Sequence, residues 1–308
     1  MKTYILPLLL LGAFYLQCTE PTKLAEDFVV VENQGGATLA YSPTSGVNII
    51  TDGNFKFKDL NKNGVLDKYE DWRLSSDERA KDLASQMTID QIAGLMLYSV
   101  HQMIPAPSTG FGASTYNGKP YAESGANPWD LTDDQKKFLK EDNLRHILVM
   151  SLESPEIAAK WNNQMQAYLE GLDLGIPGNS SSDPRHSVTT KAEFNAGGGT
   201  ISEWPRELGL AATFSPEIMR QFGEFASAEY RALGIGTALS PQIDLASEPR
   251  WFRLGMTFGE GTKLVTDLAK AYIDGFQTST GEYEIADGWG YKSVNAMVKH
   301  WPGGGAEE

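Results

Sequence analysis

The sequence predicts an α/β fold and, within that class, an incomplete TIM-like (β/α)8 barrel. From about residue 130 onward, short apolar segments typical of buried strands alternate with amphipathic segments typical of helices, which indicates a parallel sheet. Polar and charged side chains follow several of these strands, as in (β/α)8 enzymes, whereas an open doubly wound sheet gathers its ligand groups at one switch point. Only about five strands can be identified, so the barrel is expected to be incomplete.

The segments before residue 131 predict short strands, two helices and a long loop. Residues 47–60 alternate enough to indicate short extended segments. A helix is expected from Ser75 or Ser76, where a serine cap precedes acidic residues and apolar residues at helical spacing, and a second one from the cap at Thr88–Asp90. Residues 101–130 are rich in Gly, Pro, Ser and aromatic residues, and a loop of this length in a compact domain is usually functional or mobile.

The later segments supply the alternation on which the barrel prediction rests. Two of the helices begin at the serine caps Ser154 and Ser215, and the second of these ends at Gly234 or Gly236. The expected helices span residues 131–143, 154–172, 215–234 and 262–277, and the expected strands lie within residues 144–151, 174–183, 235–245 and 294–301.

Composition narrows the classes of partner. The chain has 308 residues, of which 41% are hydrophobic and 10% aromatic, enough for a sizeable core. It carries 26 basic and 40 acidic residues, a net charge of -14 without a basic stripe. A nucleic-acid backbone would be repelled by that field, so we expect no nucleic-acid partner and a neutral or cationic substrate.

The N-terminus predicts export. Lys2 precedes an apolar run over residues 4–16, which is too short to span a bilayer, where about 20 residues are needed, but suits the core of a signal peptide. Cys18 follows directly, as at a bacterial lipoprotein processing site; the alternative is a plain secretory signal with an incidental cysteine. We therefore expect a signal peptide over residues 1–18, a leader over 19–54 and a barrel domain over 55–308. The expected location is the periplasm or outer membrane of a Gram-negative bacterium, with membrane contact only through a lipid anchor.

Two strand ends carry the densest candidate chemistry. The stretch "NSSSDPRHS" places Asp183, Arg185 and His186 on one turn, where Asp183 either starts a simple turn or accepts hydrogen bonds from sugar hydroxyls through its two oxygens. Residues 240–260 crowd acidic, basic and aromatic side chains after another strand, including Arg250. An internal ion-pair network accounts for part of that density, but the density is more typical of a pocket wall.

Several long stretches together resemble one enzyme family. They read "GIPGNSSSDPRHS", "EWPRELGLAATF", "EYRALGIGTALSPQIDLASEPRW" and "KHWPGGG", and "ERAKDLASQMT" near the start fits as well. In this order they resemble the N-terminal barrel domain of glycoside hydrolase family 3, in its bacterial β-glucosidase branch, over about residues 55–308. The resemblance implies that Asp183 accepts hydrogen bonds from sugar hydroxyls and that Arg250, Lys299 and His300 also contact the terminal sugar.

The resemblance also implies a retaining reaction, with two carboxyls roughly 5 Å apart across the scissile bond. In the family the nucleophilic aspartate follows the Lys-His motif, so it is expected beyond Glu308, and the acid/base comes from a second, α/β sandwich domain. No catalytic residue is therefore expected within residues 1–308, which we expect to be inactive and poorly stable alone. The full reaction would remove terminal β-linked sugars from the non-reducing end of an oligosaccharide or β-glucoside, without a catalytic cofactor.

Two alternatives to this enzyme stay open. One is a non-catalytic, glycan-binding surface lipoprotein on the same scaffold, and the weaker one is a barrel that binds phosphate on the glycine-rich loop over residues 299–305. The hexosaminidase branch of the family carries His-Phe-Pro-Gly-His-Gly, whereas Trp301 and Gly304 stand here, which favours a β-glucosidase, xylosidase or exo-glucanase.

A separate motif predicts a structural calcium site. The stretch "DLNKNGVLDKYEDW" has the spacing of a calcium-binding loop, with a glycine at the sixth position for the sharp turn. A strand rather than a helix is expected before it, so a paired EF-hand sensor is not expected, and the alternative is an Asx-rich turn closed by its own hydrogen bonds. The expected ligands are Asp59, Asn61, Asn63, Val65 through its carbonyl, Asp67 and Glu70.

Other prominent residues indicate no further chemistry. His101 and His146 are isolated and lack the spacing of zinc ligands, and the glycines of residues 195–200 lack the Gly-Lys-Ser/Thr of a phosphate-binding loop. The tryptophans Trp129, Trp204 and Trp251 could stack on sugars, but core packing explains them equally well.

Overall fold

The computed structural model describes residues 28–187, 191–192, 195–196, 201–278, 284–286 and 289–301. The predicted signal peptide with Cys18, and the closing glycine-rich residues 302–308, lie outside these residues. Among the residues described, none of the helices is both long and apolar enough to cross a membrane.

Five strands of the main sheet run parallel and lie side by side in chain order. β7 pairs with β6 on one side and with β10 on the other, β10 pairs with β13, and β5 pairs with the free side of β6. This succession of neighbouring parallel strands is the arrangement of a (β/α)8 barrel, and within the described residues it does not close. The predicted incomplete barrel is confirmed. The strands are β5 (Gln102–Ile104), β6 (His146–Leu152), β7 (Asn179–Ser182), β10 (Thr237–Ala238) and β13 (Asn295–Ala296).

The helices begin where the sequence predicted. Ser75 and Thr88 each form a capping box, and Ser154 and Ser215 each accept a hydrogen bond from the third backbone N–H of their helix. The helices are α1 (Ser76–Gln86), α2 (Ile89–Leu95), α3 (Tyr121–Ser124), α4 (Asp133–Lys140), α5 (Pro155–Glu170), α6 (Glu207–Ala211), α7 (Pro216–Ala232) and α8 (Thr262–Gln277), with a 3-10 turn η1 (Leu254–Met256).

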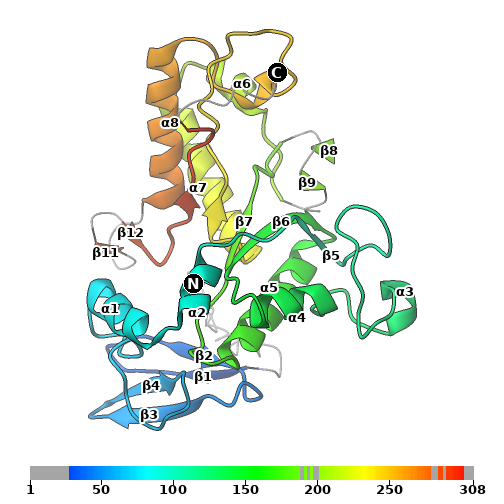
Figure 1. Cartoon of the computed structure of the whole chain (residues 1–308). Coiled ribbons are helices and arrows are strands. Elements are labelled where there is room, and N and C mark those ends of the chain that lie inside the picture. The colour runs from blue at the N-terminus through cyan, green and yellow to red at the C-terminus, as the bar shows by residue number, and fades with distance from the viewer. Residues whose placement is uncertain are drawn as a thin grey trace, which may run out of the picture.

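Short antiparallel hairpins complete the structure. Two of them, β1–β2 and β3–β4, lie in the leader and the residues directly after it, and Figure 1 shows these at one end of the molecule and α6, α7 and α8 at the other. The buried Glu170 at the end of α5 holds the leader by accepting hydrogen bonds from the Ser42 amide at 2.9 Å and from Lys58 at 2.7 Å. The strands are β1 (Val29–Val31), β2 (Leu39–Tyr41), β3 (Asn48–Asp52), β4 (Phe55–Asp59), β8 (Lys191–Ala192), β9 (Asn195–Ala196), β11 (Glu284–Ala286) and β12 (Trp289–Gly290).

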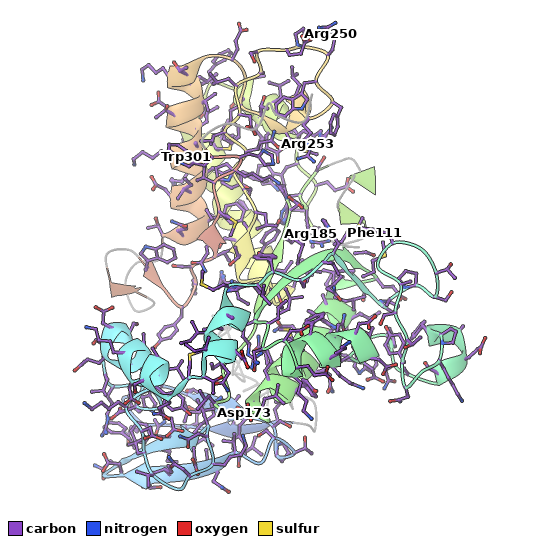
Figure 2. The ribbon with its side chains drawn as sticks, viewed as in Figure 1. Phe111, Asp173, Arg185, Arg250, Arg253 and Trp301 are labelled. Carbon is purple, nitrogen blue, oxygen red and sulfur yellow. The ribbon has the colours of Figure 1, made fainter. Side chains whose placement is uncertain are left out.

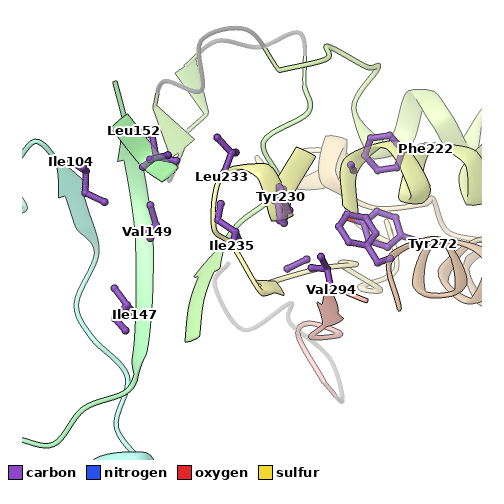
Figure 3. Packing of buried hydrophobic residues seen from close by; sticks show 14 of the residues in the cluster. Ile104, Ile147, Val149, Leu152, Phe222, Tyr230, Leu233, Ile235, Tyr272 and Val294 are labelled. Carbon is purple, nitrogen blue, oxygen red and sulfur yellow. The ribbon is translucent and has the colours of Figure 1, made fainter. Parts of the chain in front are cut away.

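The core lies between the sheet and its helices, and aromatic rings fill the part under α7 and α8 (Figure 3). The rings of Tyr272 and Phe276 stack at a centroid distance of 4.7 Å. Helices α7 and α8 approach closely because each has a glycine where they cross, Gly223 on α7 and Gly275 on α8. A Cβ on Gly275 would lie 2.4 Å from the Arg220 carbonyl oxygen and 2.9 Å from the Gly223 Cα. This contact fixes α8 closely against α7.

Two sequence-based expectations need correction. Residues 101–130 are not all loop, because β5 pairs with β6 and α3 forms within this segment. The strands expected in residues 235–245 and 294–301 are shorter, although the bridge between Gln242 and Lys299 continues their pairing. The hairpin β3–β4 spans residues 48–59 and so includes residue 54, where the leader is expected to end; the domain bounds stay a prediction.

Candidate functional site

The site is built where β7, β10 and β13 end. Asp183 follows β7 directly, and Lys299 lies three residues after β13. Because these strands are parallel neighbours, their carboxyl ends meet at one edge, and the Lys299 ammonium forms an ion pair with Asp183 Oδ1. The two side chains are 20% and 16% exposed, so water screens their attraction only partly. The structure thus brings together two of the four predicted sugar contacts.

His300, the residue after Lys299, forms a separate pair with a buried carboxylate. Its Nδ1 lies 2.9 Å from Asp244 Oδ2, and the Asp244 side chain is only 3% exposed. A carboxylate only accepts hydrogen bonds, so Nδ1 carries the proton and Nε2 of the neutral ring is left as an acceptor. The bonds from the Ile243 amide to the Lys299 carbonyl at 2.7 Å, and from the Lys299 amide to the Pro241 carbonyl at 2.9 Å, fix this register.

Arg250 lies apart from the other predicted contacts. Its side chain is 88% exposed and forms a salt bridge at 2.7 Å with Glu248 of the same loop. Arg253 instead turns inward, with Nη1 3.4 Å from His300 Nε2, and Figure 2 shows Arg250 at the tip of the loop and Arg253 nearer Trp301. Sequence reasoning missed Arg253 because both arginines follow the same strand. We call Asp183, Asp244, Arg253, Lys299 and His300 the strand-end cluster.

Buried polar groups beside the cluster have no hydrogen-bond partner among the described residues. These are Asp244 Oδ1 and both amide atoms of Gln242, whose residue is 2% exposed. Such groups are nearly always bonded in folded proteins, to protein, water or ligand. The cluster therefore has spare donors and acceptors for a polar ligand.

A second buried network holds the Asp183 loop in place. Arg185 Nη2 donates to the carbonyls of Val149 at 3.0 Å and Met150 at 2.7 Å, which belong to β6. His186 Nε2 lies 2.7 Å from Glu229 Oε2 on α7. Burial lowers the pKa of His186 to about 4, so the ring is neutral near pH 7 and faces the Glu229 carboxylate. Neither side chain is exposed, which indicates a positioning role.

Two further residues beside the cluster were not found from the sequence. Glu207 at the start of α6 is buried, and this burial raises the pKa of its carboxyl to about 7, although the positive charges of Arg206 and Lys299 act in the opposite direction. Trp301, next to His300, is 77% exposed and offers an aromatic face. Among the expected stacking candidates, by contrast, Trp251 is buried, and its position indicates packing.

The predicted calcium loop is closed by its own hydrogen bonds. Asp59 accepts the backbone N–H of Asn63 at 3.0 Å, and the side-chain amides of Asn61 and Asn63 donate to Asp67 Oδ2 at 2.7 and 2.8 Å. The two amides thus present N–H groups, where a calcium ion requires oxygen. This is the Asx-rich turn that the sequence left as the alternative.

Of the remaining predicted calcium ligands, Glu70 and Val65, one has a buried side chain and the other an exposed one. Glu70 is buried and accepts the Asp67 amide at 3.0 Å, and its burial raises the pKa of the carboxyl, whereas the Val65 side chain is exposed. Within the part of the chain that the structure describes, no three His, Cys, Asp or Glu side chains gather as a metal site. Calcium binding stays a prediction, and it requires both asparagine amides to turn.

Comparison with known proteins gives one consistent result. The model described as "Glycosyl hydrolase family 3 N terminal domain" matches residues 89–308. The periplasmic β-glucosidase/β-xylosidase of Dickeya chrysanthemi is 38% identical over 263 residues, which are 85% of this chain and 37% of that protein. β-Glucosidase C of Emericella nidulans is 36% identical over 250 residues, 81% of this chain and 36% of that protein.

Solved structures share the fold. A β-glucosidase from Erythrobacter marinus matches with a TM-score of 0.55 and 25% identity, over 76% of this chain and 27% of that chain. A β-glucosidase from Listeria innocua matches with a TM-score of 0.50 and 25% identity, over 73% of this chain and 26% of that chain. The chain spans little more than a third of the curated relatives, 37% and 36% in the two cases above.

Proposed function

Because the chain belongs to glycoside hydrolase family 3, we propose that it supplies the sugar-binding part of an exo-acting, β-glucosidase-like active site. The observation that carries this proposal is the strand-end cluster, in which acceptors and donors converge at one edge of the sheet. Relatives at 38% and 36% identity are named for β-glucosidase and β-xylosidase activity, which supports the same reaction.

The cluster has the chemistry to hold a terminal sugar. The Asp183 carboxylate accepts hydrogen bonds from hydroxyls, and Lys299 and Arg253 donate them. His300, fixed by Asp244, offers Nε2 as an acceptor. Each of these bonds involves a charged or positioned group in a partly buried site, so several together orient the ring for attack at its anomeric carbon.

We further propose a retaining mechanism whose two carboxyls come from the part of the longer relatives that follows residue 308. A nucleophilic carboxylate would attack the anomeric carbon while an acid protonates the leaving oxygen, and water then releases the sugar with the same group acting as base. The role of the residues described here is to bind and orient the sugar between those carboxyls.

Export to the periplasm is part of the proposal. The Dickeya chrysanthemi relative is named as periplasmic, and a second relative, from Salmonella typhimurium, carries the same description. The apolar run before Cys18 supports export by its composition. Lipidation of Cys18 is tested by mass spectrometry of the mature N-terminus, and a Cys18→Ala protein released from the membrane fraction would support it.

The test of the enzyme proposal is hydrolysis of aryl β-glucoside and β-xyloside by the full-length protein. Asp183→Asn removes a charged acceptor and is expected to lower kcat/KM by at least about 100-fold, since hydrogen bonds to charged groups contribute about 1.5–3 kcal/mol each. Asp173→Asn, at the far end of the molecule in Figure 2, is the matched control and should change it less than twofold. Sugar binding without any turnover would favour the non-catalytic glycan-binding protein instead.

A further inference from the structure

A cavity of about 410 Å³ lies between the leader and the helices α4 and α5, and we call it the leader cavity. None of its lining residues belongs to the strand-end cluster. It is lined by the second half of α5 and by Gly171 and Leu172, which follow this helix. Asp173, the next residue, lies beside the leader, whereas Arg253 lies toward the opposite end of the molecule (Figure 2). In a βα unit the helix runs back along the sheet, so the end of α5 lies near the amino ends of the strands.

The walls of the leader cavity are fixed by hydrogen bonds. On one side, Glu170 holds the Ser42 amide and Lys58, which anchors the leader turn that contributes Thr44 and Ser45. On another side, the Asp133 carboxylate accepts the amides of Asn117 at 2.9 Å and Gly118 at 2.8 Å and the Thr115 hydroxyl at 2.7 Å. The cavity is therefore preformed, which lowers the entropic cost of binding a ligand.

One face of α5, with the glycine that caps it, lines the cavity. Gln164, Ala167, Tyr168 and Gly171 share one face of the helix at spacings of three and four residues, and all of them line the cavity. A Cβ at Gly171 would lie 3.3 Å from the Tyr168 carbonyl oxygen and 3.5 Å from that of Ser45, so the backbone is closely packed at this part of the wall.

The lining of the leader cavity combines aromatic side chains with hydrogen-bonding groups, and its two charged side chains have opposite signs. Lys136 and Asp130 are the charged lining residues, one of each sign. Asp130 accepts from the Asn127 amide at 2.8 Å. Burial would raise the pKa of Asp133, but the hydrogen bonds from Gly118, Thr115 and Asn117, with a smaller contribution from Lys136, lower it. No ion pair or side-chain hydrogen bond of Lys136 with another described residue is found, so its ammonium is available to a ligand.

We propose that the leader cavity binds a neutral mono- or disaccharide, apart from the strand-end cluster. Tyr168 offers an aromatic face to sugar C–H groups, and the carboxylate, amide and ammonium groups match hydroxyls, which both donate and accept. The balanced lining charge favours an uncharged ligand. The volume lies at the lower end of the roughly 300–1,000 Å³ of small-molecule sites, which fits one or two sugar rings and not a polymer.

The test is calorimetric titration of the full-length protein carrying Asp183→Asn, which silences the strand-end cluster. The probes are glucose, xylose, cellobiose and laminaribiose. One site is expected to persist for at least one probe, and Lys136→Met should weaken it by about 10-fold or more through loss of a charged hydrogen bond. Lys137→Met on the same helix is the matched control, because Lys137 is exposed and does not line the cavity, and it should change Kd less than twofold.

A variant that fills the leader cavity with a larger side chain tests sugar binding there without changing any charge. In the Asp183→Asn background, Ala167→Phe should abolish sugar binding at the leader cavity. In the protein that keeps Asp183, the same Ala167→Phe change should leave hydrolysis of an aryl β-glucoside unchanged. The proposal is overturned if no probe binds to the Asp183→Asn protein, if Lys136→Met and Lys137→Met behave alike, or if Ala167→Phe with an unchanged melting temperature binds as before. Since hydrolysis is measured separately, a failure here does not depend on whether the enzyme proposal holds.

Discussion

The buried carboxyl of Glu207 makes a specific prediction about stability and pH. Burial raises its pKa from 4.5 to about 7, so the folded protein holds this proton more tightly than the unfolded chain does. Between those two values folding therefore takes up a proton, and the stability contributed by the protonated group is lost as the pH rises from 4.5 to 7. A shift of this size corresponds to about 3 kcal/mol.

Glu207→Gln is the perturbation that isolates this effect, because glutamine keeps the shape but cannot ionise. The assay is urea unfolding of both proteins between pH 4.5 and 8. The wild-type free energy of unfolding minus that of the variant should fall by about 3 kcal/mol from pH 4.5 to 7 and then stay level. His186 acts in the opposite sense, since its pKa of about 4 makes stability fall as the pH drops from 6.5 to 4, but it is common to both proteins and cancels.

A matched variant separates burial from a general charge effect. Glu217 on α7 is exposed, and Arg220 lowers the pKa of its carboxyl, so Glu217→Gln should show no fall over the same pH range. If the difference for Glu207 is flat as well, its carboxyl is charged throughout, and the account of a buried proton beside Lys299 is wrong.

Three further predictions concern the cluster and the core. Arg253→Met should lower kcat/KM for an aryl β-glucoside by about 10-fold or more, whereas Arg250→Met should change it less than twofold; the reverse order would show that Arg250 holds the sugar. Asp244→Asn should lower kcat/KM, because the carboxylate no longer fixes His300 through Nδ1; an unchanged kcat/KM would contradict this positioning role. Gly275→Ala should lower the free energy of unfolding by about 1–3 kcal/mol through overpacking, and Gly261→Ala, where the nearest atom is 3.9 Å from the added Cβ, should change it by under about 1 kcal/mol in denaturant melts.

The repeated elements were predictable because each carries a local signal. Ser75, Thr88, Ser154 and Ser215 cap the helices that the sequence placed there, and α8 spans the predicted residues 262–277. Capping is decided by residues within one turn, and the apolar period reports which face packs.

The choice between Arg250 and Arg253 could not be made from the sequence. Both follow the same strand within four residues, and the loop conformation, closed by the 3-10 turn η1, decides which one faces His300. The burial of Glu207 could not be predicted from the sequence either, because a glutamate at the start of a helix is usually exposed and is favoured there by the helix dipole. β5 was hidden in a glycine- and proline-rich segment and is specified by its pairing with β6.

The most direct test of the central claim is the inhibition constant of glucose against aryl β-glucoside hydrolysis, measured for the full-length wild-type and Lys299→Met proteins. Competition reports only binding at the site of hydrolysis. We expect Lys299→Met to raise this constant by at least about 10-fold, since it removes a charged donor, and Lys263→Met, whose side chain is 88% exposed, to leave it within twofold. An inhibition constant that is unchanged by Lys299→Met would contradict the assignment of the strand-end cluster to the sugar.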